Sequence, residues 1–167
     1  MRQSVIKRGS PLLSNVCTRV LNIKEARPII EDMMDTLMSI AQLYEFKRGH
    51  GIAAPQIGHL KRLNIVQYDG ATRVLINPEI IEHSAEKRPI REGCLSFFDV
   101  RGNVPRYTSV TISALDENGR QFTLRANDDF AMLLQHELDH LDGILYVDRL
   151  PNGDKDLYPV EHMPAIP

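Results

Sequence analysis

The sequence predicts an α+β fold in which short mixed or antiparallel β-strands pack around a central helix, preceded by an N-terminal amphipathic helix. Three observations lead to this prediction. Apolar residues recur at helical spacing over residues 28–46, short β-rich segments follow between residues 63 and 124, and a second helical pattern covers residues 128–141. This order of a helix, then strands, then one buried helix is typical of an α+β fold and not of repeated βαβ units.

The first helix is predicted over residues 28–46. Its apolar residues are spaced three or four positions apart, as on one face of a helix: Ile29, Ile30, Met33, Met34, Leu37, Ile40, Ala41 and Tyr44. Pro28 suits the first turn of a helix, where its missing N–H is not needed. Gly49 and Gly51 mark the end of the pattern.

Four short segments rich in β-branched and aliphatic side chains are predicted as strands: residues 63–68, 73–76, 110–115 and 121–124. Turn residues separate them. Asp69-Gly70 follows the first strand and Asn77-Pro78 follows the second. Residues 116–119 read DENG between the last two strands, which predicts a hairpin.

The second helix is predicted over residues 128–141. Asp128 and Asp129 favour its N-terminus, and Gly143 can close its C-terminus. A stripe of apolar residues faces the core: Ala131, Leu134, Leu138 and Leu141. This helix is therefore the central, buried one.

The central helix carries the sequence HELDH. His136 and His140 lie one turn apart on the same face, so both can bind one metal ion. Glu137 lies beside them, where a carboxylate can take a proton from a metal-bound water. The alternative is a solvent-exposed helix face that carries two histidines by chance.

The composition indicates a soluble globular protein. The chain has 167 residues, 43% of them hydrophobic and 25% charged, and a net charge of −2 without a basic stripe that would indicate nucleic-acid binding. No apolar run reaches the ~20 residues that cross a bilayer, and the N-terminus lacks the apolar segment of a secretory signal. Two cysteines are too few for a disulfide framework, so we expect a cytoplasmic protein.

A catalytic metal usually needs a third protein ligand. In a metzincin-type protease this ligand would be a histidine at the position of Tyr146, where the pattern fails. In a thermolysin-like protease it would be Glu161, in a segment broken by prolines. The remaining source is Cys94, whose thiolate suits zinc or ferrous iron, although a buried cysteine is more often a small apolar residue.

Three segments form motifs in a fixed order. Residues 49–56 read GHGIAAPQ, residues 92–96 read EGCLS and residues 135–140 read QHELDH. These resemble the motifs GxGxAAxQ, EGCLS and QHExDH of the peptide deformylase family. Weaker similarity extends the resemblance to about residues 5–150. The resemblance implies a single catalytic domain over residues 1–167, with residues 155–167 forming an irregular tail.

The resemblance also implies the reaction. Cys94, His136 and His140 would bind one divalent metal ion, usually Fe²⁺ in cells and replaceable by Zn²⁺, Ni²⁺ or Co²⁺. The N-formyl group of the initiator methionine of a nascent polypeptide would be hydrolysed to formate, by Glu137-assisted attack of a metal-bound water. The side-chain amide of Gln56 and the backbone N–H of Leu95 would stabilise the oxyanion. The expected partners are N-formylated peptides, including nascent chains at the ribosome, with neither a membrane nor direct nucleic-acid binding.

The resemblance assigns further residues to the substrate cleft and to the support of the metal site. The expected substrate-binding residues are Gly49, His50, Gly51, Ile52, Phe97, Asp129 and Met132. Glu92 is expected to support the metal site, with Arg101 as its partner. The family commonly has an aliphatic residue and proline where Phe97-Phe98 stand, an aliphatic residue in place of His50, and a large apolar residue in place of Asp129. These departures bear on substrate preference, unless Asp129 only caps the helix.

Two other functions fit parts of the sequence. A deformylase-like enzyme could act on another N-formyl compound, such as a small metabolite. A structural zinc-binding module could instead use Cys17, Cys94, His136 and His140 in Cys₂His₂ style. The second alternative leaves Glu137 and Gln56 without a role.

Overall fold

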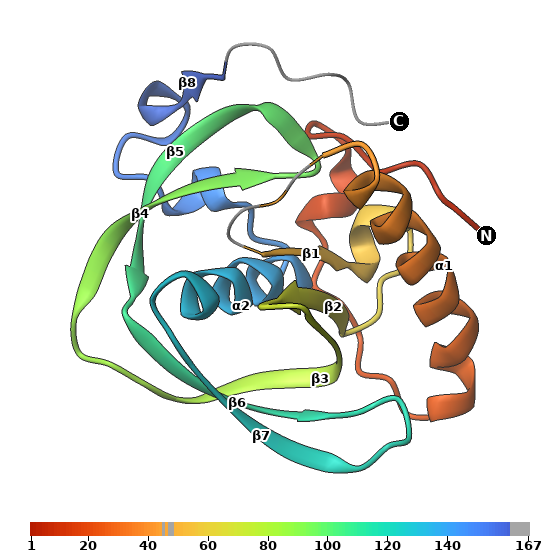
Figure 1. Ribbon diagram of the computed structural model, residues 1–167. Coiled ribbons are helices and arrows are strands. Elements are labelled where there is room, and N and C mark those ends of the chain that lie inside the picture. The colour runs from red at the N-terminus through yellow and green to blue at the C-terminus, as the bar shows by residue number, and fades with distance from the viewer. Residues whose placement is uncertain (45, 47–48, 161–167) are drawn as a thin grey trace.

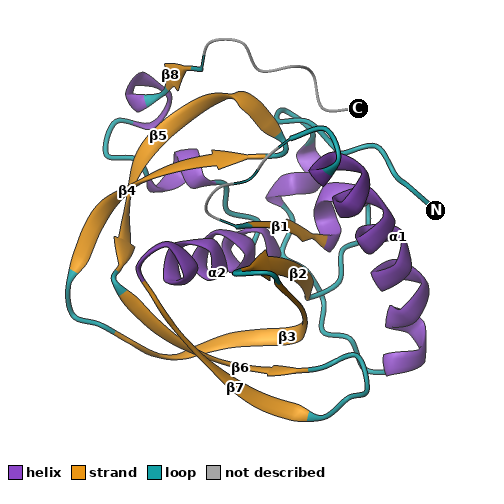
Figure 2. Ribbon diagram, viewed as in Figure 1, coloured by secondary structure: helices purple, strands orange, loops and turns teal. Residues whose placement is uncertain are grey.

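Two antiparallel β-sheets enclose a central helix (Figures 1 and 2). The structure is a computed structural model, and it describes residues 1–44, 46 and 49–160. The five-stranded sheet has the order β1-β2-β3-β6-β7, with bounds His50–Ala53, Leu63–Tyr68, Ala71–His83, Ser109–Leu115 and Gln121–Asn127. The three-stranded sheet has the order β4-β5-β8, with bounds Lys87–Cys94, Phe97–Tyr107 and Tyr158–Pro159.

The two α-helices have different positions. Helix α1, Ile23–Ala41, packs on the outside of β1 and β2, whereas α2, Asp128–Leu141, lies at the centre of the molecule among strands of both sheets (Figure 1). Four short 3₁₀ turns complete the structure: η1 Pro11–Ser14, η2 Ala54–Ile57, η3 Tyr146–Arg149 and η4 Gly153–Asp156. The α+β prediction is therefore confirmed.

Several predicted elements appear at their predicted positions. Strand β2 and helix α2 have the expected bounds, and the DENG turn joins β6 to β7. At Asp69-Gly70 both residues have positive φ, 51° and 72°, as a tight hairpin turn between β2 and β3 requires. Asn77-Pro78 does not end β3; the register of β3 against β6 shifts there, so the expected break is a β-bulge.

The first helix begins and ends five residues earlier than predicted. The side chain of Asn22 accepts a hydrogen bond from Lys24 N at 3.0 Å, and this N-cap starts the helix at Ile23. Pro28 therefore lies inside α1 and removes one intrahelical hydrogen bond. The helix ends at Ala41, so the apolar spacing continues past the helix into Tyr44, which packs against the same core.

The sequence did not predict strands β1, β4, β5 and β8. Strand β4 reads KRPIREGC, in which a proline and four charged side chains obscure the apolar alternation of a strand. It is nevertheless paired along its length with β5, up to the register shift between Glu92 and Cys94. The predicted irregular tail also has order in its described part, because Tyr158 pairs with Arg101 and Val160 N donates to Asp99 O at 2.9 Å. Residues 161–167 of that tail lie outside the described residues.

The core determines how deeply α2 is buried. One apolar cluster joins α1 to β1 and β2, a second joins α2 to the five-stranded sheet, and a third lies under β4, β5 and η3. All residues from 133 to 141 are buried as a result. Polar side chains in this segment must therefore find partners inside the protein.

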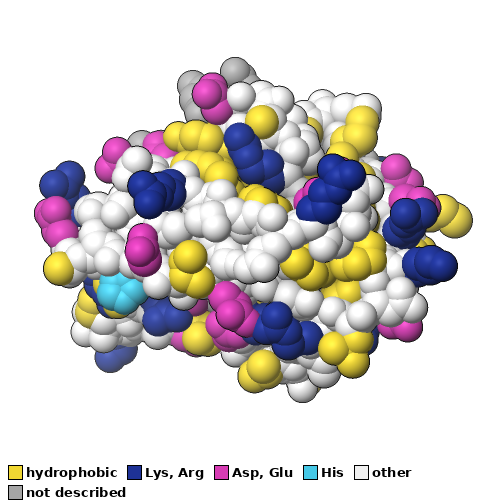
Figure 3. Space-filling model, turned by 90° about the horizontal axis from the view of Figure 1, so that it is seen from below, with side chains coloured by type: hydrophobic (Ala, Val, Ile, Leu, Met, Phe, Trp, Pro, Cys, Tyr) yellow, Lys and Arg dark blue, Asp and Glu magenta, His cyan; other side chains and the backbone are white. Residues whose placement is uncertain are grey.

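The outer face over β3, β6 and β7 has no large patch of one charge. Figure 3 shows lysine, arginine, aspartate and glutamate side chains interspersed there with scattered apolar ones. Among the described helices, none has the length and apolar character to span a membrane.

Candidate metal and catalytic site

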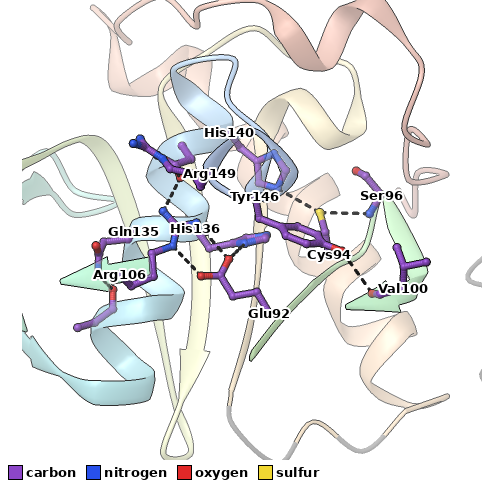
Figure 4. A network of polar contacts seen from close by, with 12 residues as sticks. Glu92, Cys94, Ser96, Val100, Arg106, Gln135, His136, His140, Tyr146 and Arg149 are labelled. Carbon is purple, nitrogen blue, oxygen red and sulfur yellow. Dashed lines mark hydrogen bonds and ion pairs between the residues drawn. The ribbon is translucent and has the colours of Figure 1, made fainter. Parts of the chain in front are cut away.

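The structure brings Cys94 next to His136 and His140, two residues of one helix that lie far from Cys94 in the sequence. Cys94 is the last residue of β4, and both histidines come from the inward face of α2. Their candidate ligand atoms all lie within 4.8 Å of one another, and Cys94 Sγ is 3.3 Å from His140 Nε2 (Figure 4). All three side chains are buried.

A carboxylate orients His136. Glu92 Oε2 lies 2.8 Å from His136 Nδ1, which leaves Nε2 for the centre of the cluster. Arg106 in turn binds Glu92, with its Nε donating to Oε1 at 2.6 Å and its Nη2 donating to Oε2 at 3.1 Å (Figure 4). Glu92 thus contacts the candidate ligand His136, and its arginine partner is Arg106. The expected pairing of Glu92 with Arg101 is wrong.

Arg106 extends this network from Glu92 to Asp139 of α2. Its Nη1 donates to Asp139 Oδ2 at 2.5 Å, and Asp139 also accepts from Arg149 Nε at 3.0 Å and Nη2 at 2.6 Å. Sequence reasoning did not identify Arg106, Asp139 or Arg149. Asp139 could have been found, because a carboxylate inside a buried helix needs a cationic partner.

Electrostatics in the cluster favour a bound cation. Burial opposes ionisation of the Cys94 thiol, but His140 and His136 outweigh burial and hold the pKa of Cys94 well below its usual value. Burial likewise opposes protonation of His136, but hydrogen bonds to Cys94 and Glu92 raise its pKa well above the usual value. Cys94 is therefore stabilised as a thiolate beside protonated imidazole, and a divalent cation can take the place of these protons.

The donor set fits one divalent metal ion. A thiolate and two imidazoles suit zinc and ferrous iron, and three protein ligands leave a position open for chemistry. His140 Nδ1 is buried without a hydrogen-bond partner among the described residues, so only His136 has a carboxylate behind it. Cys17 is not part of the cluster: it packs with Ala53 and Leu141, and burial raises its pKa to about 11. A four-ligand Cys₂His₂ site is therefore not formed.

Glu137 lines one cavity together with Cys94 and His136, and its side chain lies against the backbone of β1. A Cβ atom on Gly51 would come within 2.6 Å of Glu137 Oε1, so only glycine leaves room for the carboxylate there. The Glu137 side chain is buried, and its Oε2 has no hydrogen-bond partner among the described residues. Burial raises the pKa of Glu137 to about 7, which suits a group that must both accept and return a proton near neutral pH.

Replacing Gly51 with alanine is expected to displace the Glu137 carboxylate. The added methyl group overlaps the carboxylate, and misplacing a catalytic group by about 1 Å can lower the rate by about 10²-fold. Steady-state assays of Gly51→Ala measure the effect on kcat. If the metal content and melting temperature are unchanged, the loss of kcat is due to the displaced Glu137 carboxylate. A wild-type kcat would contradict this placement of Glu137 against Gly51.

Gln56 directs its amide nitrogen toward the cysteine. The residue lies in η2, where its Oε1 accepts from Ala53 N at 2.8 Å, which fixes the orientation of the amide. Its Nε2 therefore faces Ser96 Oγ at 3.2 Å and Cys94 Sγ at 3.5 Å. Leu95 follows Cys94 in the turn between β4 and β5. Sequence reasoning did not identify Ser96 as the partner of Gln56.

A cavity of about 770 Å³ opens beside these groups. Of the predicted substrate-binding residues, Gly49, His50, Gly51 and Met132 line it. Ile52, Phe97 and Asp129 are not among its lining residues, so their role in substrate binding stays a prediction. Ile52 points into the core under α1, and the Phe97 ring stacks on Tyr146 with centroids 4.5 Å apart. The alternation of side chains along a strand sends Ile52 to the opposite face from Gly51.

Aromatic side chains form the outer part of the cavity. Phe98 lines it and makes an edge contact with Tyr44, with ring centroids 4.7 Å apart. Phe46 stacks on His50 at 4.4 Å. Burial lowers the pKa of His50, which keeps this ring neutral and lets it act as an apolar surface.

Comparison with known proteins gives one consistent result. The family model described as polypeptide deformylase matches residues 2–156. A peptide deformylase from Heliobacterium modesticaldum is 39% identical over 153 residues, which cover 91% of this chain and 96% of that protein.

Solved structures agree. The structure of a peptide deformylase from Synechococcus elongatus in complex with actinonin is similar with a TM-score of 0.81 and 37% identity, covering 90% of this chain and 79% of that one. The Met-Ala-Ser-bound structure of a class I type b peptide deformylase from Acinetobacter baumannii is similar with a TM-score of 0.79 and 32% identity, covering 90% and 99%.

Proposed function

The chain belongs to the peptide deformylase family, and from this membership we infer that it removes the N-formyl group of the initiator methionine of nascent polypeptides and releases formate. The observation that supports this most directly is a buried carboxylate, Glu137, beside the Cys94, His136 and His140 cluster in one cavity. Hydrolysis of a formamide needs an activated water and a proton carrier, and this arrangement can provide both.

We propose that Cys94, His136 and His140 hold one divalent ion, with Fe²⁺ in cells and Zn²⁺, Ni²⁺ or Co²⁺ as substitutes. When bound, such an ion supplies a Lewis acid that polarises a carbonyl group and lowers the pKa of water. Glu92 keeps His136 in the tautomer that presents Nε2 to the ion, and Arg106 keeps Glu92 ionised.

Glu137 is the proposed proton carrier. In its ionised form it takes a proton from the attacking water, and it then gives that proton to the nitrogen that leaves from the formyl carbon. A carboxyl group with a pKa of about 7 can perform both transfers near neutral pH. Oε2, which has no hydrogen-bond partner in the described part of the chain, is the atom available for these transfers.

Gln56 and Leu95 are the proposed oxyanion donors. Nε2 of Gln56 is already directed toward Cys94, and no bond rotation is needed to aim it at a carbonyl oxygen bound there. Leu95 would contribute its backbone N–H from the turn after Cys94.

Replacing Gln56 with alanine is expected to lower kcat by about 10²–10³-fold, the usual cost of one lost oxyanion donor. The measurement is formate release at saturating substrate. Ser96→Ala is the matched control, because it removes the partner of Gln56 but leaves the amide; it should lose less activity than Gln56→Ala. Equal losses would instead indicate that the Gln56 amide does not act directly.

The substrate backbone is proposed to pair with β1. This strand is at the edge of the five-stranded sheet, where no strand of the described residues pairs with its outer edge, and a peptide strand can add there. The Acinetobacter baumannii relative binds Met-Ala-Ser and the Synechococcus elongatus relative binds actinonin, which supports a peptide as the substrate of this chain. We further propose that the protein acts in the cytoplasm, on chains that emerge from the ribosome.

Formate release from formyl-Met-Ala-Ser by anaerobically purified, Fe²⁺-loaded protein tests the proposed function. We expect turnover that a chelator abolishes and added Fe²⁺ restores. Acetyl-Met-Ala-Ser and formamide are the controls and should not be hydrolysed. Turnover of a small formamide without turnover of the peptide would contradict the proposed substrate and indicate another N-formyl compound.

A further inference from the structure

Two arginines line the cavity on its β4 and β5 side. Arg91 belongs to β4 and is exposed, and Arg101 belongs to β5 and is half-buried. Neither residue has a role in the proton transfer or in the metal site described above. Their presence beside a peptide cleft needs an explanation.

The position of Arg101 is fixed. Its Nη1 donates to the carbonyl oxygens of Phe98 and Val100 at 2.7 and 2.8 Å. The guanidinium also lies on Gly93, where a Cβ atom would come within 2.5 Å of Arg101 Cζ. One cation is therefore held directly beside the residue that precedes Cys94.

Among the residues that the structure describes, no carboxylate forms an ion pair with Arg91 or Arg101. The two carboxylates that line the cavity are engaged elsewhere, because Glu92 is bound by Arg106 and Glu137 lies against Gly51. Burial lowers the pKa of Arg101, and the nearby charge of Arg91 lowers it further. An anion placed between the two guanidiniums would relieve this repulsion.

The spacing along β4 indicates where such an anion would come from. Arg91 lies three residues before Cys94, which is roughly 10 Å along a strand at about 3.3 Å per residue. An extended peptide advances by a similar distance per residue. A peptide that lies between β1 and β4, with its formyl group at Cys94, and runs along β4 toward Arg91 would thus bring its second or third residue to the wall that the two arginines line.

We propose that Arg91 and Arg101 form a carboxylate subsite that favours formylated peptides with an acidic second or third residue. The proposal rests on the proposed function and adds a substrate preference to it. The carboxylate can come from an aspartate or glutamate side chain, or from the C-terminus of a short peptide. Arginine suits either source, because its planar N–H groups match the two carboxylate oxygens.

The test compares kcat/KM for four peptides with the Fe²⁺-loaded protein. These are formyl-Met-Ala-Ser-amide, formyl-Met-Asp-Ser-amide, formyl-Met-Ala-Asp-amide and formyl-Met-Ala-Ser with a free carboxylate. We expect kcat/KM for at least one charged peptide to exceed kcat/KM for the neutral amide by about three- to tenfold. This gain lies between the effects of an exposed ion pair and of a half-buried charged hydrogen bond. The advantage should shrink in 0.5 M salt, where the Debye length is only about 4 Å.

Variants assign the preference to the two residues. Arg91→Gln combined with Arg101→Gln should bring the ratio of kcat/KM for charged and neutral peptides close to one. Arg91→Glu should lower this ratio below one. Arg88→Gln is the matched control, because Arg88 is also on β4 but pairs with Glu86 and does not line the cavity. It should leave the ratio unchanged. Using a ratio separates this effect from general damage to the enzyme.

Two outcomes would overturn the subsite. Wild-type ratios near one for all charged peptides would do so, and so would a preference that survives in the double variant. If no peptide is deformylated, the proposed function fails, and calorimetric binding of Met-Ala-Asp-amide against Met-Ala-Ser-amide then decides the subsite alone. Equal affinities in that measurement would reject it, and tighter binding of the acidic peptide, lost in the double variant, would support it.

Discussion

Replacing Glu137 with glutamine is expected to lower kcat by about 10²–10⁴-fold, the contribution of a positioned general acid–base group. Glutamine has nearly the same shape as glutamate, so it fits over Gly51 without the overlap that constrains this position. It cannot accept the proton from water, and the reaction loses its proton carrier. Formate release in single-turnover and steady-state assays measures the loss.

The control for Glu137→Gln is the metal content. Glu137 is not one of the three clustered ligand residues, so the variant should still bind one ion per chain. Cys94→Ala should instead lose both the ion and the activity. If Glu137→Gln were fully active with its ion bound, Glu137 would not be the proton carrier, and a structural role for the cluster would become the better interpretation.

Replacing Arg106 with methionine is expected to destabilise the folded protein by about 3–5 kcal/mol. The Arg106 side chain is 3% exposed and holds two buried carboxylates, those of Glu92 and Asp139. Methionine fills much of the volume but removes the cation that the two carboxylates share, so that Glu92 keeps only His136 and Asp139 keeps only Arg149. Urea unfolding measures the loss, as a lower midpoint with an unchanged slope.

Arg149→Met is the matched control for Arg106→Met. Arg149 binds the same Asp139, but its side chain is 41% exposed, so water can replace it and the loss should be about 1 kcal/mol or less. Arg106→Met should also weaken zinc binding by about 10–100-fold, because Glu92 would no longer be held against His136. Equal stabilities of the two variants would show that the network does not depend on Arg106.

The metal ligands illustrate what local sequence can predict. His136 and His140 share one face of α2 because residues four apart on any helix do so, and the structure places them there. Cys94 was one of several sources for the third ligand when the residues were considered by themselves. The family resemblance selected it, and the folding of β4 against α2 brings its sulfur to 3.3 Å from His140.

The substrate cleft illustrates the limit of such predictions. His50, Gly51 and Met132 line the cavity as expected, but Ile52, Phe97 and Asp129 do not. A motif identifies a segment, whereas the side of the strand or helix on which each side chain lies depends on register and on the packing partner. Phe97 is turned away because it stacks on Tyr146, a residue distant in sequence.

The sequence by itself determined the α+β class, strand β2, the bounds of α2 and the histidine pair with its glutamate. These features depend on periodicity, turn residues and helix geometry, which act over a few neighbouring residues. Only the tertiary structure decided the partner of Glu92. Arg101 and Arg106 are both arginines on β5, yet Arg106 meets Glu92 inside the protein and Arg101 faces the cavity. The distinction arises because a buried carboxylate requires the cation that the folded chain places within hydrogen-bond distance, and sequence spacing does not encode that distance.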